Sequence, residues 1–325
     1  MKFKDLLTSS SILSIPGLVS IFISLLAIPI HLEYAGPENY GNYIIFHFIL
    51  LISINLNFGI GKSVTISINN FINKKKEIGY EAIIYTKNIT LVIFIVFLIL
   101  FFLKKIYILD LTKFYEYTSY LFLGSIITIF FVTFEGILQG NKKFKSISIL
   151  NLFFFSLSTS IPSILLIHNK NLSLENLIFI SLLIKFFAVL SMFLIIKNND
   201  LYKISKSKIL LINLKKNSKW ITLNSILIQF YDLFDKYLVK IFLGPIAVAT
   251  YSIPQQLTGK LSVISKSFSA FLLPDLSGKK INNSNFNFSL QIFIKFIPIF
   301  IFILLPFYPI ILEFWLGNNF NETIN

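Results

Sequence analysis

The chain has 325 residues, of which 55% are hydrophobic and only 14% are charged, and its mean hydropathy is +0.77. These values lie outside the range of soluble globular proteins and indicate an all-α polytopic membrane protein. The chain contains no cysteine, which excludes a disulfide framework and any cysteine-based metal site. All 29 of its basic residues are lysines, and the formal net charge is +14.

The lysines gather on one side of the predicted membrane spans. Nineteen of them lie on one side, at the N-terminus, in alternate connections or in the adjoining parts of two spans, four lie in the other connections, and six lie deeper within spans. Because lysine is enriched on the cytoplasmic side of membrane proteins, the N-terminus is predicted to be cytoplasmic. The positive charge is therefore interpreted as membrane topology, and nucleic-acid binding is disfavoured.

Nine apolar stretches are long enough to cross a bilayer core as helices. The first ends near residue 32, and it lacks the small-residue cleavage site of a signal peptide. The other eight are predicted at about 43–70, 82–103, 118–138, 147–167, 174–196, 220–243, 247–273 and 289–312. The longest and most basic connection, 197–219, is expected to be a cytoplasmic linker between two helical lobes.

A short motif occurs twice in the chain. Each copy has a Gly-Pro pair, a small residue five positions after the glycine and a tyrosine seven positions after it. The first copy is Gly36, Pro37, Gly41 and Tyr43, and the second is Gly244, Pro245, Ala249 and Tyr251. Glycine permits unusual dihedral angles and proline fixes φ, so each copy predicts a turn, with the tyrosine as an interfacial anchor. The spacing of 208 residues indicates an internal duplication.

The duplication predicts the domain organisation. We expect a six-helix N-terminal lobe at 1–196, the basic linker at 197–219, and an incomplete C-terminal lobe of three helices at 220–325. A complete second lobe would contain three more helices, so the full fold is expected to have twelve. The sequence is therefore interpreted as C-terminally truncated.

The stretch 219–251 has the length of a spanning helix but carries charges in its middle. Gln229, Asp232 and Lys236 recur at helical spacing on one face, and Asp235 lies on the flank of that face. A charge deep in a bilayer is costly and usually faces a cavity or a partner. Asp232 and Lys236 are four residues apart and can form an ion pair, but the lining of a transport cavity is favoured.

Two further lysines lie deep within predicted spans. Lys185 is in the sixth span and Lys260 in the eighth, and both are too deep to reach the interface easily. The predicted substrate cavity is therefore lined by Lys185, Gln229, Asp232, Asp235, Lys236 and Lys260.

Small residues and histidines complete the features within or beside the spans. Gly136 and Gly140 have the spacing that lets two helices pack closely. His31, His47 and His168 are expected near the outer face, where placement at the interface without a function is favoured over proton sensing.

Six motifs along the chain resemble one family in order and spacing. They are Tyr34-Ala-Gly-Pro-Glu-Asn-Tyr-Gly-Asn-Tyr43, Asn57-Phe-Gly-Ile-Gly-Lys-Ser-Val64, Glu135-Gly-Ile-Leu-Gln-Gly140, Asp235-Lys-Tyr-Leu238, Leu273-Pro-Asp-Leu-Ser277 and Phe314-Trp-Leu-Gly317. The family is that of the bacterial lipid-linked oligosaccharide (O-antigen) flippases. It belongs to the multidrug, oligosaccharidyl-lipid and polysaccharide exporter (MOP) superfamily.

The resemblance implies two six-helix lobes around a central cavity that opens alternately to the two sides of the bacterial cytoplasmic (inner) membrane. It implies an undecaprenyl-diphosphate-linked oligosaccharide as cargo and no cofactor. The expected partners are membrane lipids, a coupling proton or sodium ion, and other membrane proteins of glycan assembly. The chain has lysine where the family often has arginine, and lysine recognises a diphosphate with less geometric specificity.

Three alternatives remain open at this stage. A related cation-coupled drug or small-molecule antiporter would use acidic residues such as Asp232 and Asp235. A membrane enzyme of envelope glycan assembly is disfavoured, because the connection at 104–117 offers no catalytic constellation, so the chain is not predicted to be an enzyme. The third alternative is that the truncated chain is inactive.

Overall fold

The computed structural model describes residues 26–47, 59–105, 118–169, 172–204 and 207–276, together with a few single positions outside these ranges. Residues 26–47 are helical, and all other regular elements within the described ranges are helices as well. The elements are α2 (Ile60–Asn70), η1 (Ile72–Lys74), α3 (Lys75–Lys105), α5 (Thr118–Gly140), α6 (Phe144–Asn151), η2 (Leu152–Leu157), α7 (Ser158–His168), α8 (Leu174–Asn198) and α9 (Lys208–Leu276). The predicted all-α class is confirmed.

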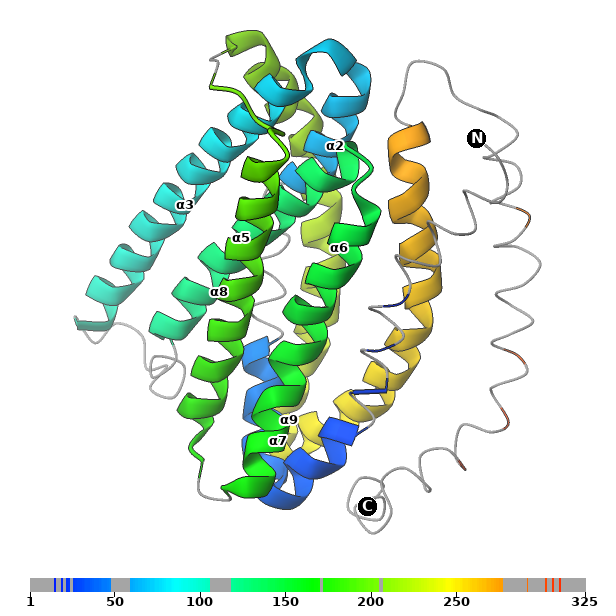
Figure 1. The fold of residues 1–325 in the computed structure, drawn as a ribbon. Coiled ribbons are helices and arrows are strands. Elements are labelled where there is room, and N and C mark those ends of the chain that lie inside the picture. Colours follow the sequence, from blue (N-terminus) through cyan, green and yellow to red (C-terminus); the bar gives the residue numbers. More distant parts are fainter. Residues whose placement is uncertain are drawn as a thin grey trace.

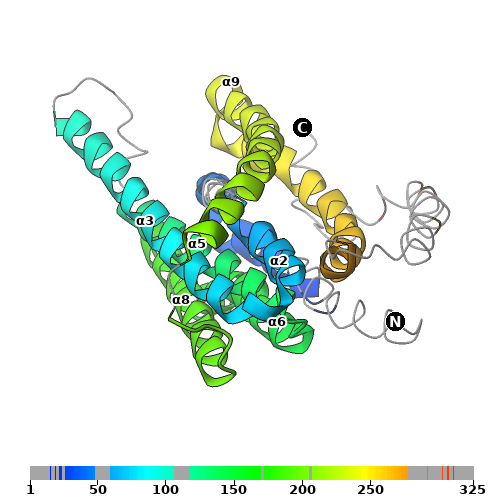
Figure 2. The same ribbon diagram turned by 90° about the horizontal axis from the view of Figure 1, so that it is seen from above.

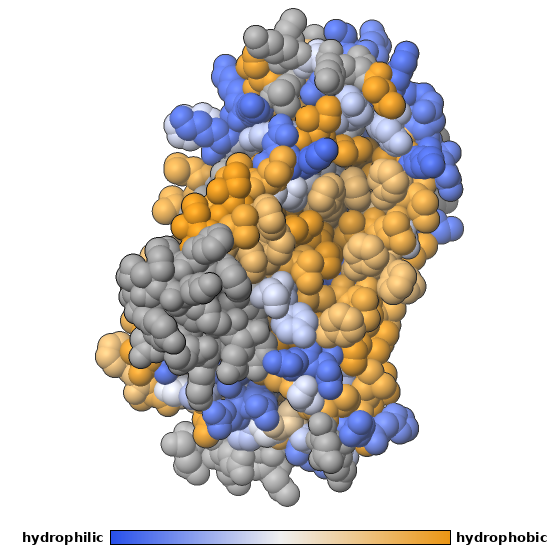
Figure 3. Space-filling view, turned by 90° about the vertical axis from the view of Figure 1, so that its left-hand side faces the viewer, coloured by the Kyte–Doolittle hydropathy of each residue, from blue (hydrophilic) through white to orange (hydrophobic). Residues whose placement is uncertain are grey.

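Five helical stretches are long and apolar enough to cross a membrane. They are Ile72–Ile99, Ser119–Gly140, Phe144–His168, Leu174–Asn198 and Phe234–Ile253. The helices run side by side in a bundle (Figure 1), and the surface has a hydrophobic band between two hydrophilic ends (Figure 3). Such a band is the surface that a bilayer core covers. The chain is a multi-pass helical membrane protein.

Four predicted spans correspond closely to observed helices. The spans at 82–103, 118–138 and 174–196 lie within α3, α5 and α8, and the span at 147–167 covers α6, η2 and α7. These last three elements form one continuous rod, in which η2 is a π-helical turn and α7 contains Pro162. The span predicted at 289–312 lies outside the described ranges, so its prediction stays open.

The start of α9 differs from the sequence prediction. The helix begins at Lys208, so most of the predicted linker 197–219 is helical. Leu210, Leu214 and Ser218 recur every four residues and are buried, at 3%, 1% and 1% exposure, whereas Lys216 is exposed. This segment is therefore an amphipathic helix that packs on α2 and α3. Its lysines give it the composition of a loop, and only the spacing of its apolar residues indicates the helix.

The core of the bundle forms where α2 crosses α5. A Cβ atom built on Gly136 would lie 2.3 Å from the carbonyl oxygen of Gly61, and one built on Gly140 would lie 2.9 Å from the Ile68 side chain. Backbones that approach this closely exclude any side chain between them. The close packing predicted for Gly136 and Gly140 is confirmed.

Three connections meet at one end of the bundle, which we call the loop end (Figure 1). The segment after α8 lies against the start of α3 through two contacts. The Lys203 amide donates a hydrogen bond to the Lys76 carbonyl at 3.0 Å, and the Lys76 side chain forms an ion pair with Asp200. The Lys143 ammonium donates to Asn199 at 3.0 Å. These contacts hold the α5–α6 and α8–α9 connections to the start of α3.

Candidate functional site

The two Gly-Pro motifs have the same backbone conformation. Gly36 and Gly244 have φ angles of 80° and 84°, in the left-handed region that favours glycine. Gly244 interrupts α9, and the second segment of α9 runs back from the end of the bundle opposite the loop end (Figures 1 and 2). We call this the Gly-Pro end. Each predicted turn is a sharp break between helical segments.

The two motifs also touch each other. A Cβ atom on Gly41 would lie only 2.2 Å from the carbonyl oxygen of Pro245, so the first motif packs directly on the backbone of the second. Beside this contact, the Lys240 ammonium lies 3.5 Å from the Asn42 side-chain oxygen. The two copies of the motif, which are offset by 208 residues in the sequence, are therefore brought together in the fold, as an internal repeat with related halves would predict.

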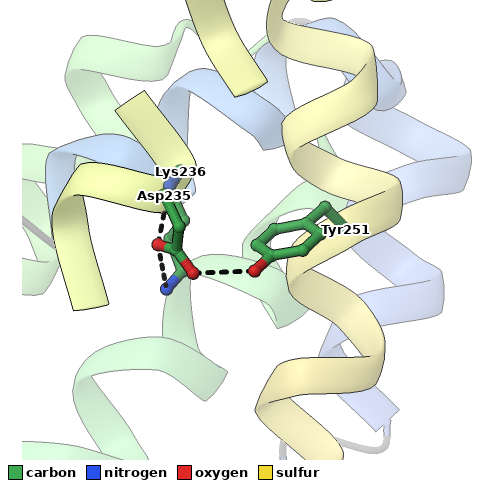
Figure 4. Close-up of polar contacts among 3 residues, drawn as sticks. All are labelled: Asp235, Lys236 and Tyr251. Atoms are coloured by element: carbon green, nitrogen blue, oxygen red, sulfur yellow. Dashed lines mark hydrogen bonds and ion pairs between the residues drawn. The ribbon is translucent and has the colours of Figure 1, made fainter. Parts of the chain in front are cut away.

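A charged pair lies next to the break in α9 (Figure 4). The Lys236 ammonium is 3.8 Å from Asp235 Oδ1, and the Lys236 side chain is 2% exposed whereas that of Asp235 is 30% exposed. The Tyr251 hydroxyl, on the second segment of α9, donates to Asp235 Oδ2 at 2.7 Å. The Lys236 amide donates to Asp235 Oδ1, also at 2.7 Å. We call these three residues the hinge triad.

Sequence spacing allows an ion pair between Asp232 and Lys236, and that prediction stays open because the Asp232 side chain is outside the described part of the structure. Lys236 lies near Asp235, its neighbour in sequence, and the separation of 3.8 Å is longer than a hydrogen bond. Both Asp235 oxygens accept shorter hydrogen bonds, one from the Lys236 amide and one from the Tyr251 hydroxyl. Gln229, Asp232 and Lys260 lie on α9, but their side chains are outside the described part of the structure. Their roles stay predictions.

Lys185 lies in a separate place. It is on α8, which packs on α5 and α7, and its side chain is 7% exposed. Its ammonium lies 5.5 Å from the centroid of the Phe154 ring, a cation–π contact with the π-helical turn η2. No described interaction joins Lys185 to the hinge triad.

His31 and Tyr43 are buried in the protein, whereas His168 is exposed at the end of α7. His31 and Tyr43 are 3% and 5% exposed, and their rings stack with centroids 5.0 Å apart. His47 packs edge-on against Tyr43, at 4.4 Å. His31 and Tyr43 therefore belong to a buried polar cluster. Their expected position near the outer face of the membrane stays a prediction. Sequence reasoning missed this cluster, although the spacing of four residues between Tyr43 and His47 places both on one helix face.

The two tyrosines of the repeated motif lie in different environments. Tyr43 is buried, whereas Tyr251 is 43% exposed and bonded to Asp235. The equivalent positions of the two motifs thus belong to a buried polar cluster at the first motif and to the hinge triad at the second.

The comparisons with known proteins agree with this architecture. A solved structure described as the outward-facing conformation of a multidrug resistance MATE family transporter of the MOP superfamily matches with a TM-score of 0.70 and 18% identity. The match covers 97% of this chain and 76% of that chain. The chain has the MOP-superfamily fold. The resemblance expected from the six motifs is confirmed at the level of the fold.

Two further comparisons concern other members of this group. A MOP superfamily transporter from Pyrococcus furiosus matches with a TM-score of 0.61 and 17% identity, over 83% of this chain and 63% of that chain. A curated Shigella flexneri protein named "Putative O-antigen transporter" is 28% identical over 195 residues, which are 57% of this chain and 45% of that protein. The match thus spans less than half of that relative. No protein-family model matches the chain.

Proposed function

We propose that this protein is a flippase that moves a lipid-linked oligosaccharide across the bacterial cytoplasmic membrane. The cargo is an undecaprenyl-diphosphate-linked glycan for O-antigen or polysaccharide synthesis. The diphosphate and glycan pass through a cavity between two lobes, the lipid tail stays in the bilayer, and the lobes rock so that the cavity opens alternately to each side. The named Shigella flexneri relative supports this cargo class.

The observation that carries the proposal is the buried Lys236 ammonium beside the break in α9. A buried cation is costly unless an anion compensates it. Asp235, 3.8 Å away and 30% exposed, is an anion beside this ammonium. The diphosphate of the cargo would be a further anion for Lys236, because lysine binds phosphate as a point charge.

The other proposed cavity residues are Gln229, Asp232 and Lys260, which lie on the same helix as Lys236. Lysines on both segments of α9 would follow the diphosphate during a rocking motion, because the break at Gly244 lets the two segments change their angle. Lys185 lies apart from these residues, among α8, α5 and η2.

The test is complementation in a bacterium that lacks its own O-antigen flippase. We expect expression of the gene to restore long O-antigen on the lipopolysaccharide, and Lys236→Ala to abolish it at equal protein level in the membrane. Lys219→Ala is the matched control, because Lys219 is an exposed lysine of the same helix. Full O-antigen with Lys236→Ala would remove that residue from the proposal, and no restoration by the natural protein in several host strains would contradict the cargo.

A second candidate is a cation-coupled drug antiporter, which the likeness to a MATE structure favours. In that case the partly exposed Asp235 carboxylate would bind a cationic substrate. Drug susceptibility of an efflux-deficient strain separates the two functions. Increased resistance to cationic drugs that depends on Asp235, without any effect on O-antigen, would favour the antiporter.

A further inference from the structure

We propose that the N-terminal lobe holds a binding site for a small monovalent anion of the halide type. The site lies between the helix at 26–47 and α8. Four polar side chains form it, Tyr43, His47, Ser181 and Lys185, which we call the anion quartet. It is distinct from the hinge triad and takes a ligand other than the cargo.

The quartet consists of two pairs on two helices. Tyr43 and His47 are one helical turn apart, and so are Ser181 and Lys185, so each pair occupies one face of its helix. The Tyr43 hydroxyl lies beside Ser181, and the Lys185 ammonium acts electrostatically on His47. The two pairs therefore face each other across the helix contact.

Three members of the quartet are buried and His47 is half-buried, and three of their polar atoms have no hydrogen-bond partner among the described residues. Tyr43, Ser181 and Lys185 are 5%, 0% and 7% exposed. The Tyr43 hydroxyl, Ser181 Oγ and His47 Nε2 have no hydrogen-bond partner in the described structure. Buried polar groups nearly always have such partners in native proteins. Three of them around one lysine indicate that a ligand or an ordered water completes the site.

The chemistry of the quartet selects an anion. An ammonium, two hydroxyls and an imidazole can all donate hydrogen bonds. The single charge is that of Lys185, which forms no ion pair with any described carboxylate and whose ammonium lies 5.5 Å from the centroid of the Phe154 ring. A monovalent anion neutralises this charge, whereas a divalent phosphate would leave a buried negative charge and a metal cation would be repelled.

The surroundings favour a weakly hydrated ion. Apolar side chains of the same two helices, including Phe46, Leu177 and Leu182, form a buried cluster together with Tyr43. His31 stacks on Tyr43, and its Nδ1 donates to the Ala27 carbonyl at 3.1 Å, which holds the Tyr43 ring in place. Chloride and bromide lose their hydration at lower cost than a carboxylate such as acetate or formate, so an enclosed site favours them over these carboxylates.

Thermal denaturation of the purified full chain in detergent tests the proposal. Sodium chloride is compared with sodium gluconate at equal ionic strength. We expect chloride to raise the melting temperature by about 3 °C or more, with saturation, because a ligand that binds only the folded state stabilises it. Bromide should replace chloride, and radiolabelled chloride should bind to the protein and be displaced by bromide.

The variants locate the effect. Lys185→Met should remove both the chloride response and the binding. Ser181→Ala and Tyr43→Phe should weaken both several-fold, and they test the site even when Lys185→Met does not fold. Lys87→Met is the matched control, because Lys87 is an exposed lysine of a spanning helix. An unchanged response in all three quartet variants, or equal stability in chloride and gluconate without binding, would overturn the proposal, and the quartet would then hold water. Stabilisation by acetate that exceeds that by chloride would overturn the halide assignment in favour of a carboxylate.

Discussion

Tyr251 and Asp235 are joined by a hydrogen bond of 2.7 Å that spans the break in α9 at Gly244. The two residues lie on different segments of the helix, so the bond sets the angle between them (Figure 4). It also directs one Asp235 oxygen away from Lys236. The hydrogen bond therefore couples the geometry of the break to the charge balance of the proposed cavity.

Removal of this hydrogen bond should loosen the break. We expect Tyr251→Phe to destabilise the protein by about 1 kcal/mol. This loss is small for a hydrogen bond to a charged group, because the side chains of Tyr251 and Asp235 are both partly exposed. Thermal denaturation in detergent measures the effect. Tyr237→Phe is the control, since Tyr237 is equally exposed, at 43%, on the first segment of α9. Equal effects of the two variants would mean that the Tyr251 hydroxyl contributes nothing to the break.

The charges of Asp235 and Lys236 should be coupled. Asp235→Asn keeps an acceptor for Tyr251 but removes the negative charge near a buried ammonium, and we expect a loss of about 1–2 kcal/mol. Lys236→Met should cost less, because an apolar side chain of similar length fits a buried site. In a double-mutant cycle, the second change should offset about 1 kcal/mol of the first. Strict additivity of the two single effects would show that the pair does not interact.

The contact between the two Gly-Pro motifs should tolerate no side chain. Gly41→Ala would place a Cβ atom 2.2 Å from the Pro245 carbonyl oxygen, so we expect a loss of about 3 kcal/mol or failure to fold. Gly244→Ala meets no atom within 4 Å, and its cost of about 1–2 kcal/mol comes from the left-handed backbone alone. Gly244→Asn should be milder than Gly244→Ala, because asparagine adopts this conformation more readily. Melting temperatures of the three variants give the order, and a Gly41→Ala protein as stable as the natural one would disprove the close contact.

The crossing of α2 and α5 gives a prediction for the core of the N-terminal lobe. Gly136→Ala should destabilise the protein by about 3 kcal/mol, because the new methyl group would meet the Gly61 backbone. Ser119→Ala, at an exposed position of the same helix, should change stability by less than about 0.5 kcal/mol. The yield of monodisperse protein and its melting temperature report both effects. Similar values for Gly136→Ala and Ser119→Ala would contradict the packing of this crossing.

Composition and apolar run length predict the class of the fold and most of its helices, since a bilayer demands helices of a narrow range of lengths. The spans at α3, α5 and α8 could be read directly, and the repeated Gly-Pro motif predicted two related breaks. The start of α9 was harder to predict, because a segment with the lysines found between 208 and 219 has the composition of a loop. The burial of Leu210 and Leu214 depends on the neighbouring helices α2 and α3.

The chain alone therefore determines that these helices form and that some carry charges too deep for the lipid. Which charges meet is decided by the tertiary structure. Lys236 lies beside Asp235 and Tyr251, and Lys185 lies near His47 and the Phe154 ring, whereas depth along a predicted span assigns neither lysine a neighbour. The reason is physical: periodicity gives the face of a helix on which a residue lies, but the neighbour of that face depends on helix crossings, such as that of Gly61 with Gly136, between residues far apart in the sequence.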